Sequence, residues 1–148
     1  GGLRESQFAF LEAYLATLKR DRRIVIAAHI PFFDEPGRET FRRADRERLF
    51  ALLAPFRKVL LLSGHGHVQR HHRHGPADGW QGATPLHEYN VGAACGGYWS
   101  GPADAQGIPD ARMSDGTPNG YATAGFDADG GYWLRWHVAR GQGEALHL

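Results

Sequence analysis

Cysteine and methionine are almost absent from this chain, because Cys95 and Met113 are their only examples among 148 residues. A single cysteine excludes an intramolecular disulfide and a cysteine-rich zinc module. The chain begins at Gly1 without an initiator methionine, so we interpret it as a piece of a longer protein whose targeting segment would lie upstream. A secreted or periplasmic location is compatible with these features, but the sequence does not fix the compartment.

The sequence also lacks a long apolar run and a strong excess of charge of either sign. No stretch of about eighteen or more apolar residues occurs, which excludes a membrane-spanning helix. Seventeen Lys and Arg residues oppose sixteen Asp and Glu residues, a formal net charge of +1. Proteins that act on the nucleic-acid backbone carry a larger basic excess, so the composition argues against a nucleic-acid partner.

The N-terminal part of the chain alternates helix and strand patterns. Apolar residues recur at helical spacing behind Ser6, a favourable N-cap, and predict a helix over residues 6–19. Residues 24–28 predict a buried parallel strand, residues 45–54 a second, arginine-rich helix with a solvated outer face, and residues 59–63 a second buried strand. Together they form a βαβ unit. The helix residues expected to face the core are Phe8, Leu11, Leu15, Leu18, Leu49 and Leu53.

Glycine is concentrated in the rest of the chain, where fifteen of the twenty glycines lie between Gly64 and Gly131. The strand patterns of this part cover residues 68–74, 86–91, 121–127 and 131–138. The last two are joined by a turn at residues 128–130 and predict a hairpin. Residues 95–120 have no periodicity, which is typical of a long functional loop.

Three histidines follow the two predicted parallel strands. His29 comes after the first strand, and His65 and His67, in a Gly-His-Gly-His string, come after the second. Because the carboxyl ends of neighbouring parallel strands meet at one crevice, we expect these side chains to converge. Neutral imidazole is the commonest side-chain metal ligand, and three imidazoles suit zinc, manganese or iron better than magnesium or calcium. The pattern therefore predicts a transition-metal site.

Chance is the alternative, since a Gly-His-x-His string can arise without function in a chain with nine histidines. Its placement beside a second strand-end histidine favours ligands. Residues 70–74, which are all Arg or His, place successive side chains on opposite faces of a strand and are interpreted as a solvated strand. Cys95 is interpreted as a small buried residue, and Trp133 and Trp136 as packing residues.

With their strands and the helix between them, the His29-Ile30-Pro31 and Gly-His-Gly-His segments resemble the last two metal motifs of the calcineurin-like metallophosphoesterases. The resemblance implies an α/β fold, the C-terminal part of a β-sandwich flanked by helices and followed by a loop-rich β region. It implies a hydrolase that acts on a phosphoester with two Mn, Fe or Zn ions as cofactors. By motif match, His29 and His65 would bind one ion and His67 the other.

Three further segments, residues 90–92, 97–101 and 113–121, resemble a bacterial subgroup of this family that carries a dedicated C-terminal domain. The resemblance implies that residues 1–92 belong to the metallophosphoesterase domain. Residues 93–148 would complete that domain or lead into a C-terminal one. The resemblance also suggests Trp99 and Asn119 as substrate-binding residues, although the segment around Asn119 could equally form two consecutive turns.

The earlier motifs of the family, Asp-x-His, Gly-Asp-x-x-Asp and Gly-Asn-His-Asp/Glu, do not occur in this sequence. They supply the bridging aspartate, the remaining ligands and the histidine that assists the leaving group. No catalytic residue is therefore assigned here, and this chain by itself is expected to be inactive. Two alternatives remain open, a non-catalytic module that binds carbohydrate or protein and a single-zinc hydrolase of another class. An Asp-x-His motif upstream would favour the phosphoesterase.

Overall fold

The computed structural model describes residues 1–35, 38–139 and 146–147, and it confirms a mixed α/β fold. The chain divides into two compact units. The first consists of Gly1–Ser63 and His71–Tyr89, and the second of Gly64–Arg70 and Asn90–Leu148. The segment with the Gly-His-Gly-His string thus groups with the C-terminal part of the chain. Neither described helix is long and apolar enough to cross a membrane.

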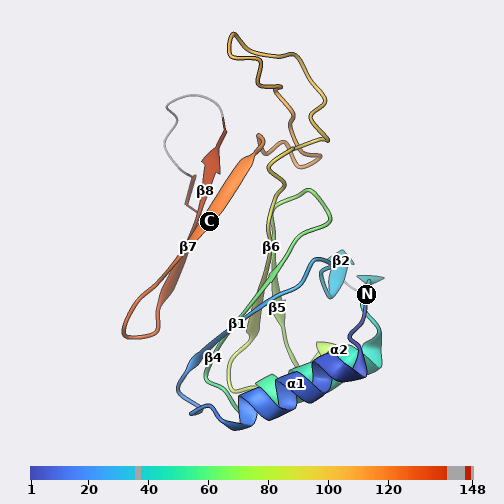
Figure 1. Cartoon of the computed structure of the whole chain (residues 1–148), viewed down its shortest axis with the longest axis vertical. Coiled ribbons are helices and arrows are strands. Elements are labelled where there is room, and N and C mark those ends of the chain that lie inside the picture. Colours follow the sequence, from blue (N-terminus) through green and yellow to red (C-terminus); the bar gives the residue numbers. More distant parts are fainter. Residues whose placement is uncertain (36–37, 140–145, 148) are drawn as a thin grey trace. The chain divides into compact units, whose positions relative to one another are not determined.

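A four-stranded sheet, with strand order β1-β4-β6-β5, belongs largely to the first unit (Figure 1). Its strands are β1 (Arg23–Ala27), β4 (Lys58–Ser63), β5 (Arg70–His74) and β6 (Leu86–Asn90). β1 and β4 are parallel, with Ala27 opposite Leu62, as the predicted βαβ unit requires. Three short elements complete this part, namely β2 (Phe33–Glu35), its antiparallel partner β3 (Arg38–Glu39) and the 3-10 turn η1 (Pro76–Asp78).

The two helices, α1 (Glu5–Ala16) and α2 (Arg43–Leu53), lie side by side (Figure 1). Their apolar faces join the core of the first unit as predicted. The predicted core residues Phe8, Leu15, Leu49 and Leu53 are buried and Leu11 is partly buried. Leu18 is also partly buried but lies beyond the end of α1, which is shorter at this end than predicted. The core also contains a group of aromatic rings: Phe32, Phe33, Phe41, Phe50, Phe56 and Trp80.

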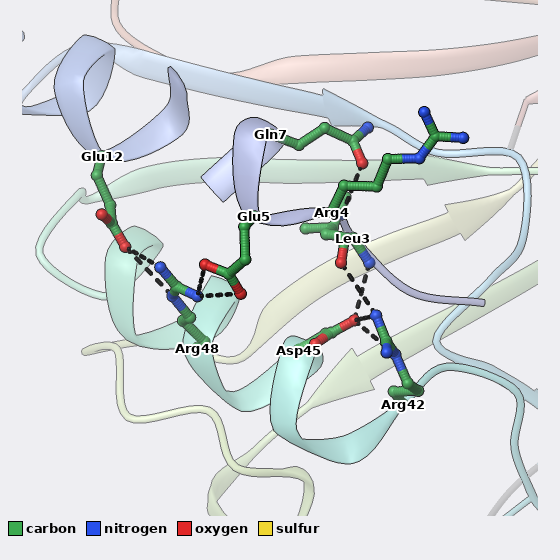
Figure 2. Close-up of polar contacts among 8 residues, drawn as sticks. All are labelled: Leu3, Arg4, Glu5, Gln7, Glu12, Arg42, Asp45 and Arg48. Atoms are coloured by element: carbon green, nitrogen blue, oxygen red, sulfur yellow. Dashed lines mark hydrogen bonds and ion pairs between the residues drawn. The ribbon is translucent and has the colours of Figure 1, made fainter. Parts of the chain in front are cut away.

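Helix α1 begins earlier than predicted, because Arg4 and not Ser6 is its N-cap. The Arg4 N–H donates to Gln7 Oε1 at 2.9 Å, so the third helical residue satisfies the capping position from within the helix. Polar contacts then tie α1 to α2 (Figure 2). The guanidinium of Arg48 on α2 lies 2.9 Å from the carboxylate of Glu5 and 2.8 Å from that of Glu12, both on α1.

Some side chains of the first unit depart from the sequence predictions. β1 is the edge strand of the described sheet and Val25 is exposed, so β1 is not buried on both faces. Arg46 on α2 is buried, with its Nη1 atom 3.3 Å from Glu39 Oε2. His74 of β5 is also buried. Arg46 and His74 each face a carboxylate, and a partner of that kind is what allows a polar side chain to be buried.

The second unit contains an antiparallel sheet of β7 (Gly120–Phe126), β8 (Tyr132–Val138) and β9 (Leu146–His147). The predicted hairpin joins β7 to β8, and its turn is closed by the Gly130 N–H, which donates to the Asp127 carbonyl at 3.0 Å. Trp136 is buried as predicted, but Trp133 is 45% exposed. The two tryptophans lie an odd number of positions apart and therefore face opposite sides of the strand.

Candidate metal centre

The candidate histidines follow the adjacent ends of β1 and β4. Just past the last residue of β1, the Ala28 N–H donates to the Leu62 carbonyl at 2.9 Å, so the two strand ends remain paired to that point. His29 and His65 each stand two positions after the last residue of their strand, and both are exposed. His67 stands two positions further along and is half-buried.

His29 belongs to the first unit, whereas His65 and His67 belong to the second. Among the residues that the structure describes, no group of three or more His, Cys, Asp or Glu side chains is placed to hold a metal ion. The joint site of His29, His65 and His67 therefore stays a prediction. What the structure does describe in detail is how the second unit holds the segment that carries His65 and His67.

The backbone of this segment adopts an uncommon conformation. His65 has φ +72° and His67 has φ +49°, both in the left-handed region that non-glycine residues seldom occupy. Such residues cost of order 1–3 kcal/mol each and persist only where their surroundings hold them. They cluster at ligand-binding and catalytic sites. The conformation favours a functional role for this segment over a chance string.

The imidazole of His67 is fixed by a loop from the C-terminal part of the chain. Its Nδ1 atom lies 2.7 Å from the carbonyl oxygen of Gly96. A carbonyl oxygen can only accept, so Nδ1 carries the hydrogen and the neutral ring presents its lone pair at Nε2. The Tyr98 ring stacks on the His67 ring, with centroids 4.4 Å apart and an interplanar angle of 29°. Cys95 was expected to be buried but is only half-buried. Its Sγ atom lies 3.8 Å from His67 Nδ1.

Further hydrogen bonds hold the residues that follow His67. Asn90 Nδ2 donates to the Val68 carbonyl at 2.8 Å, and the Gly92 N–H donates to Gln69 Oε1 at 3.2 Å. The Gln69 N–H donates in turn to Asp115 Oδ2 at 2.6 Å. Burial by itself raises the pKa of Asp115, but the N–H groups of Gln69 and Thr117 stabilise the carboxylate and leave its pKa below the ordinary value.

Two glycines allow the loop above His67 to lie against another part of the backbone. A Cβ atom on Gly96 would stand 1.5 Å from the Ala111 carbonyl oxygen, and one on Gly97 would stand 2.8 Å from the Arg112 carbonyl oxygen. Neither position leaves room for a side chain without a shift of the backbone. Close packing of Gly96 and Gly97 against the backbone of Ala111 and Arg112 therefore holds the Gly96 carbonyl in position to accept from His67.

The two residues suggested as substrate contacts lie in different environments. Trp99 is exposed and has φ +59°, directly after Tyr98 at φ +60°. Asn119 is fully buried, and a Cβ atom on Gly96 would stand 3.0 Å from the Asn119 Cβ atom. Neither the Nδ2 nor the Oδ1 atom of Asn119 has a hydrogen-bond partner among the described residues. A substrate-binding role for Trp99 or Asn119 stays a prediction.

Glu88 is a buried polar residue that the sequence analysis did not single out. It is fully buried on β6, where its Oε2 atom lies 2.7 Å from His74 Nε2. Its Oε1 atom accepts the Phe32 N–H at 3.2 Å, three residues beyond His29. An acidic residue inside the apolar pattern of a predicted strand is the signal that could have identified it, because a buried carboxylate needs such partners.

A second histidine pair lies on β5 and β6, where His71 Nδ1 is 2.8 Å from His87 Nε2. Burial lowers the pKa of His87 to about 3, and the positive charge of Arg73 adds to this effect. Burial and Arg73 also lower the pKa of His71. Both rings are therefore neutral at physiological pH, and one donates a hydrogen bond to the other.

Comparison with known protein families bears on the region that holds His67. Residues 88–145 match the family model described as the C terminal of calcineurin-like phosphoesterase. The matched region includes Asn90, Gly92, Gly96, Tyr98 and Asp115, the residues that contact the segment from His67 to Gln69. No curated protein and no solved structure gave a significant match to this chain.

Proposed function

We propose that residues 88–145, which match the C-terminal domain of calcineurin-like phosphoesterase, support the metal site of a phosphoester hydrolase formed by the full protein. The matched family indicates a metallophosphoesterase parent. The finer assignment, a two-metal site with His29, His65 and His67 among its ligands, rests on the motif resemblance and on the local geometry of this chain. The substrate is a phosphoester, and the cofactors are two Mn, Fe or Zn ions.

In this proposal His29 and His65 hold one ion and His67 holds the second. The donor set fits such ions, because imidazole nitrogens are preferred by Zn and Fe over Mg or Ca. When bound, the ions polarise the phosphoryl oxygens and lower the pKa of water at the site. The residues of this chain bind and orient, and none of them is assigned the role of general base.

One observation carries the proposal, namely the hydrogen bond from His67 Nδ1 to the Gly96 carbonyl. Metal-ligating histidines almost always donate their other ring N–H to a carbonyl or carboxylate, which fixes the tautomer and the orientation of the ring. The left-handed backbone at His65 and His67 supports the same interpretation, because it is costly by itself. The residues that follow are held by the Asn90 Nδ2 donation to the Val68 carbonyl and by the Gln69 N–H donation to the Asp115 carboxylate.

The architecture of the parent follows from the same proposal. We infer a metallophosphoesterase-type sandwich to which residues 1–92 contribute, with residues 93–148 completing it. The grouping of Gly64–Arg70 with Asn90–Leu148 supports completion of the domain over a separate C-terminal module. The exposed edge position of β1 is compatible with further strands beside it.

A carbohydrate-binding role is the second candidate, and one observation favours it. Tyr121 and Trp133 are exposed on the same face of the β7–β8 hairpin, where the Tyr121 ring stacks on His137 and the Arg135 guanidinium lies over the Trp133 ring. Exposed rings on a sheet face suit stacking on sugars. In that case the protein would bind a glycan without metal-dependent hydrolysis of a phosphoester.

The test compares the longest form of the protein with its His67→Ala and His137→Ala variants, each with added Mn²⁺ or Zn²⁺ and an aryl phosphate. We expect metal-dependent hydrolysis by the wild type and by the His137 variant. The His67 variant should lose turnover by about 100-fold or more while its circular dichroism stays unchanged, because the loss of a ligand is more severe than the roughly 10–100-fold loss of an outer partner. Full activity of His67→Ala would contradict the proposal. Polysaccharide binding without hydrolysis would favour the second candidate.

A further inference from the structure

Tyr98 combines three features that ordinary packing does not explain. Its side chain is 78% exposed, the most exposed of the large hydrophobic residues that the structure describes. One face of its ring is nevertheless fixed by the stack on His67. Its backbone is in the left-handed region at φ +60°, followed by Trp99 at φ +59°. Two consecutive non-glycine residues in this region are strained, and burial of an apolar side chain does not compensate for that strain at Tyr98.

The strained turn is held by its own hydrogen bonds. The Trp99 N–H donates to the Cys95 carbonyl at 2.8 Å, and the Ser100 N–H donates to the Gly97 carbonyl at 3.1 Å. Together with the close packing of Gly96 on Ala111, these contacts hold the Tyr98 ring beside the imidazole. The ring is therefore preorganised, which lowers the entropy lost when a ligand stacks on it.

We propose that Tyr98 contacts the substrate and selects phosphoesters whose leaving group carries a flat aromatic ring. This inference rests on the proposed function, in which His67 is a metal ligand. A phosphoryl group bound at that site would bring its ester substituent beside the Tyr98 ring. Aromatic rings stack face to face with an offset or edge to face, and a short saturated leaving group such as glycerol offers no such face.

The competing explanation is that Tyr98 only holds the His67 ring in place, and this explanation makes a different prediction. If Tyr98 only kept the imidazole in place, its loss would weaken every ligand of the site equally. If it contacts the leaving group, its loss should weaken ligands that carry a ring and spare those that do not. Tyr121 offers a matched control, because it is another exposed tyrosine, 58% accessible, that stacks on a histidine, His137 on β8.

The experiment measures binding by calorimetry to the longest form of the protein loaded with Mn²⁺. The probes are phenylphosphonate and methylphosphonate, which share the phosphoryl group and differ in the ring, and neither is hydrolysed. We expect the wild type to bind phenylphosphonate about tenfold more tightly, a difference of about 1.4 kcal/mol, because only the phenyl compound offers a ring that can stack on Tyr98. Tyr98→Phe and Tyr121→Leu should keep this preference, and Tyr98→Leu should abolish it while methylphosphonate binding stays unchanged.

The outcomes separate this inference from the proposed function. Failure of both phosphonates to bind the wild type would overturn the proposed metal site, and the inference with it. Binding of methylphosphonate without a preference for the phenyl compound would overturn the inference alone. The same holds for a Tyr98→Leu variant that keeps the preference, or one that loses affinity equally for both probes.

Discussion

At the scale of single residues, a glycine can be required by a left-handed backbone or by close approach of another segment, and Gly96 and Gly107 allow the two requirements to be compared. Both have positive φ, +53° and +79°, but only Gly96 lies against another segment, whereas nothing lies within 4 Å of a Cβ atom on Gly107. Gly107→Ala should cost about 1–2 kcal/mol for the left-handed conformation alone. Gly96→Ala should add about 1–3 kcal/mol for the overlap with the Ala111 carbonyl. Chemical denaturation of both variants measures the difference, and equal losses would show that the loop adapts without cost.

The pH dependence of stability depends in part on His87. Its pKa is about 3 in the folded chain, lowered first by burial and then by the nearby Arg73, His71 and His74, whereas an unfolded histidine titrates near 6.5. Between these values the unfolded chain binds the additional proton. The free energy of unfolding should therefore fall as pH drops from about 6.5 towards 3, by up to about 1.4 kcal/mol per pH unit from this residue.

The variant His87→Gln removes this titration and should flatten the pH dependence over that window. Denaturation of the wild type and of this variant at several pH values between 4 and 7 checks it. Parallel slopes for wild type and His87→Gln would show that His87 does not carry the effect. Above about pH 6.5 the difference between the two slopes should vanish.

At the scale of elements, two phenylalanines on α1 report which face of the helix is buried. Phe8 is 1% exposed and lies in the core, whereas Phe10 is 64% exposed and stacks on Tyr14 of the same helix. Phe8→Ala should cost about 3–5 kcal/mol, because it leaves a cavity in the packed interior. Phe10→Ala should stay within about 0.5 kcal/mol of the wild type. Similar losses in denaturant midpoint would contradict the burial of the Phe8 face of α1 in the core.

The elements themselves were largely predictable from the sequence, because apolar periodicity is a local property. The order of strands and helices followed from it, and so did the hairpin of β7 and β8. The burial of Arg46 and His74 did not, because it depends on Glu39 and Glu88, partners that periodicity does not reveal. The exposure of Val25 depends on the position of β1 at an edge, which an apolar run cannot indicate.

At the scale of the whole molecule, the sequence indicated candidate ligands but not the groups that orient them. His29, His65 and His67 were identified by their positions after predicted strands, and their convergence stays a prediction. The contact of His67 with Gly96 joins residues 29 positions apart through an irregular loop. The path of such a loop depends on close approaches, like that of Gly96 to Ala111, for which a sequence pattern records only the glycine.

The last prediction concerns this chain by itself. Three neutral imidazoles provide no negative charge to offset two divalent ions, and the family motif that supplies the bridging aspartate does not occur in residues 1–148. We therefore expect the chain to bind a single Zn²⁺ weakly, with an affinity that falls as pH is lowered, because protons compete for the ligand nitrogens. We also expect it to hydrolyse aryl phosphate far more slowly than the longest form of the protein. Calorimetric Zn²⁺ titration at several pH values tests the first expectation, and His67→Ala should weaken binding while His137→Ala should not. Metal-dependent turnover by the chain at the rate of the longer form would show that residues 1–148 contain a complete site and would overturn the assignment of the missing ligands to upstream motifs.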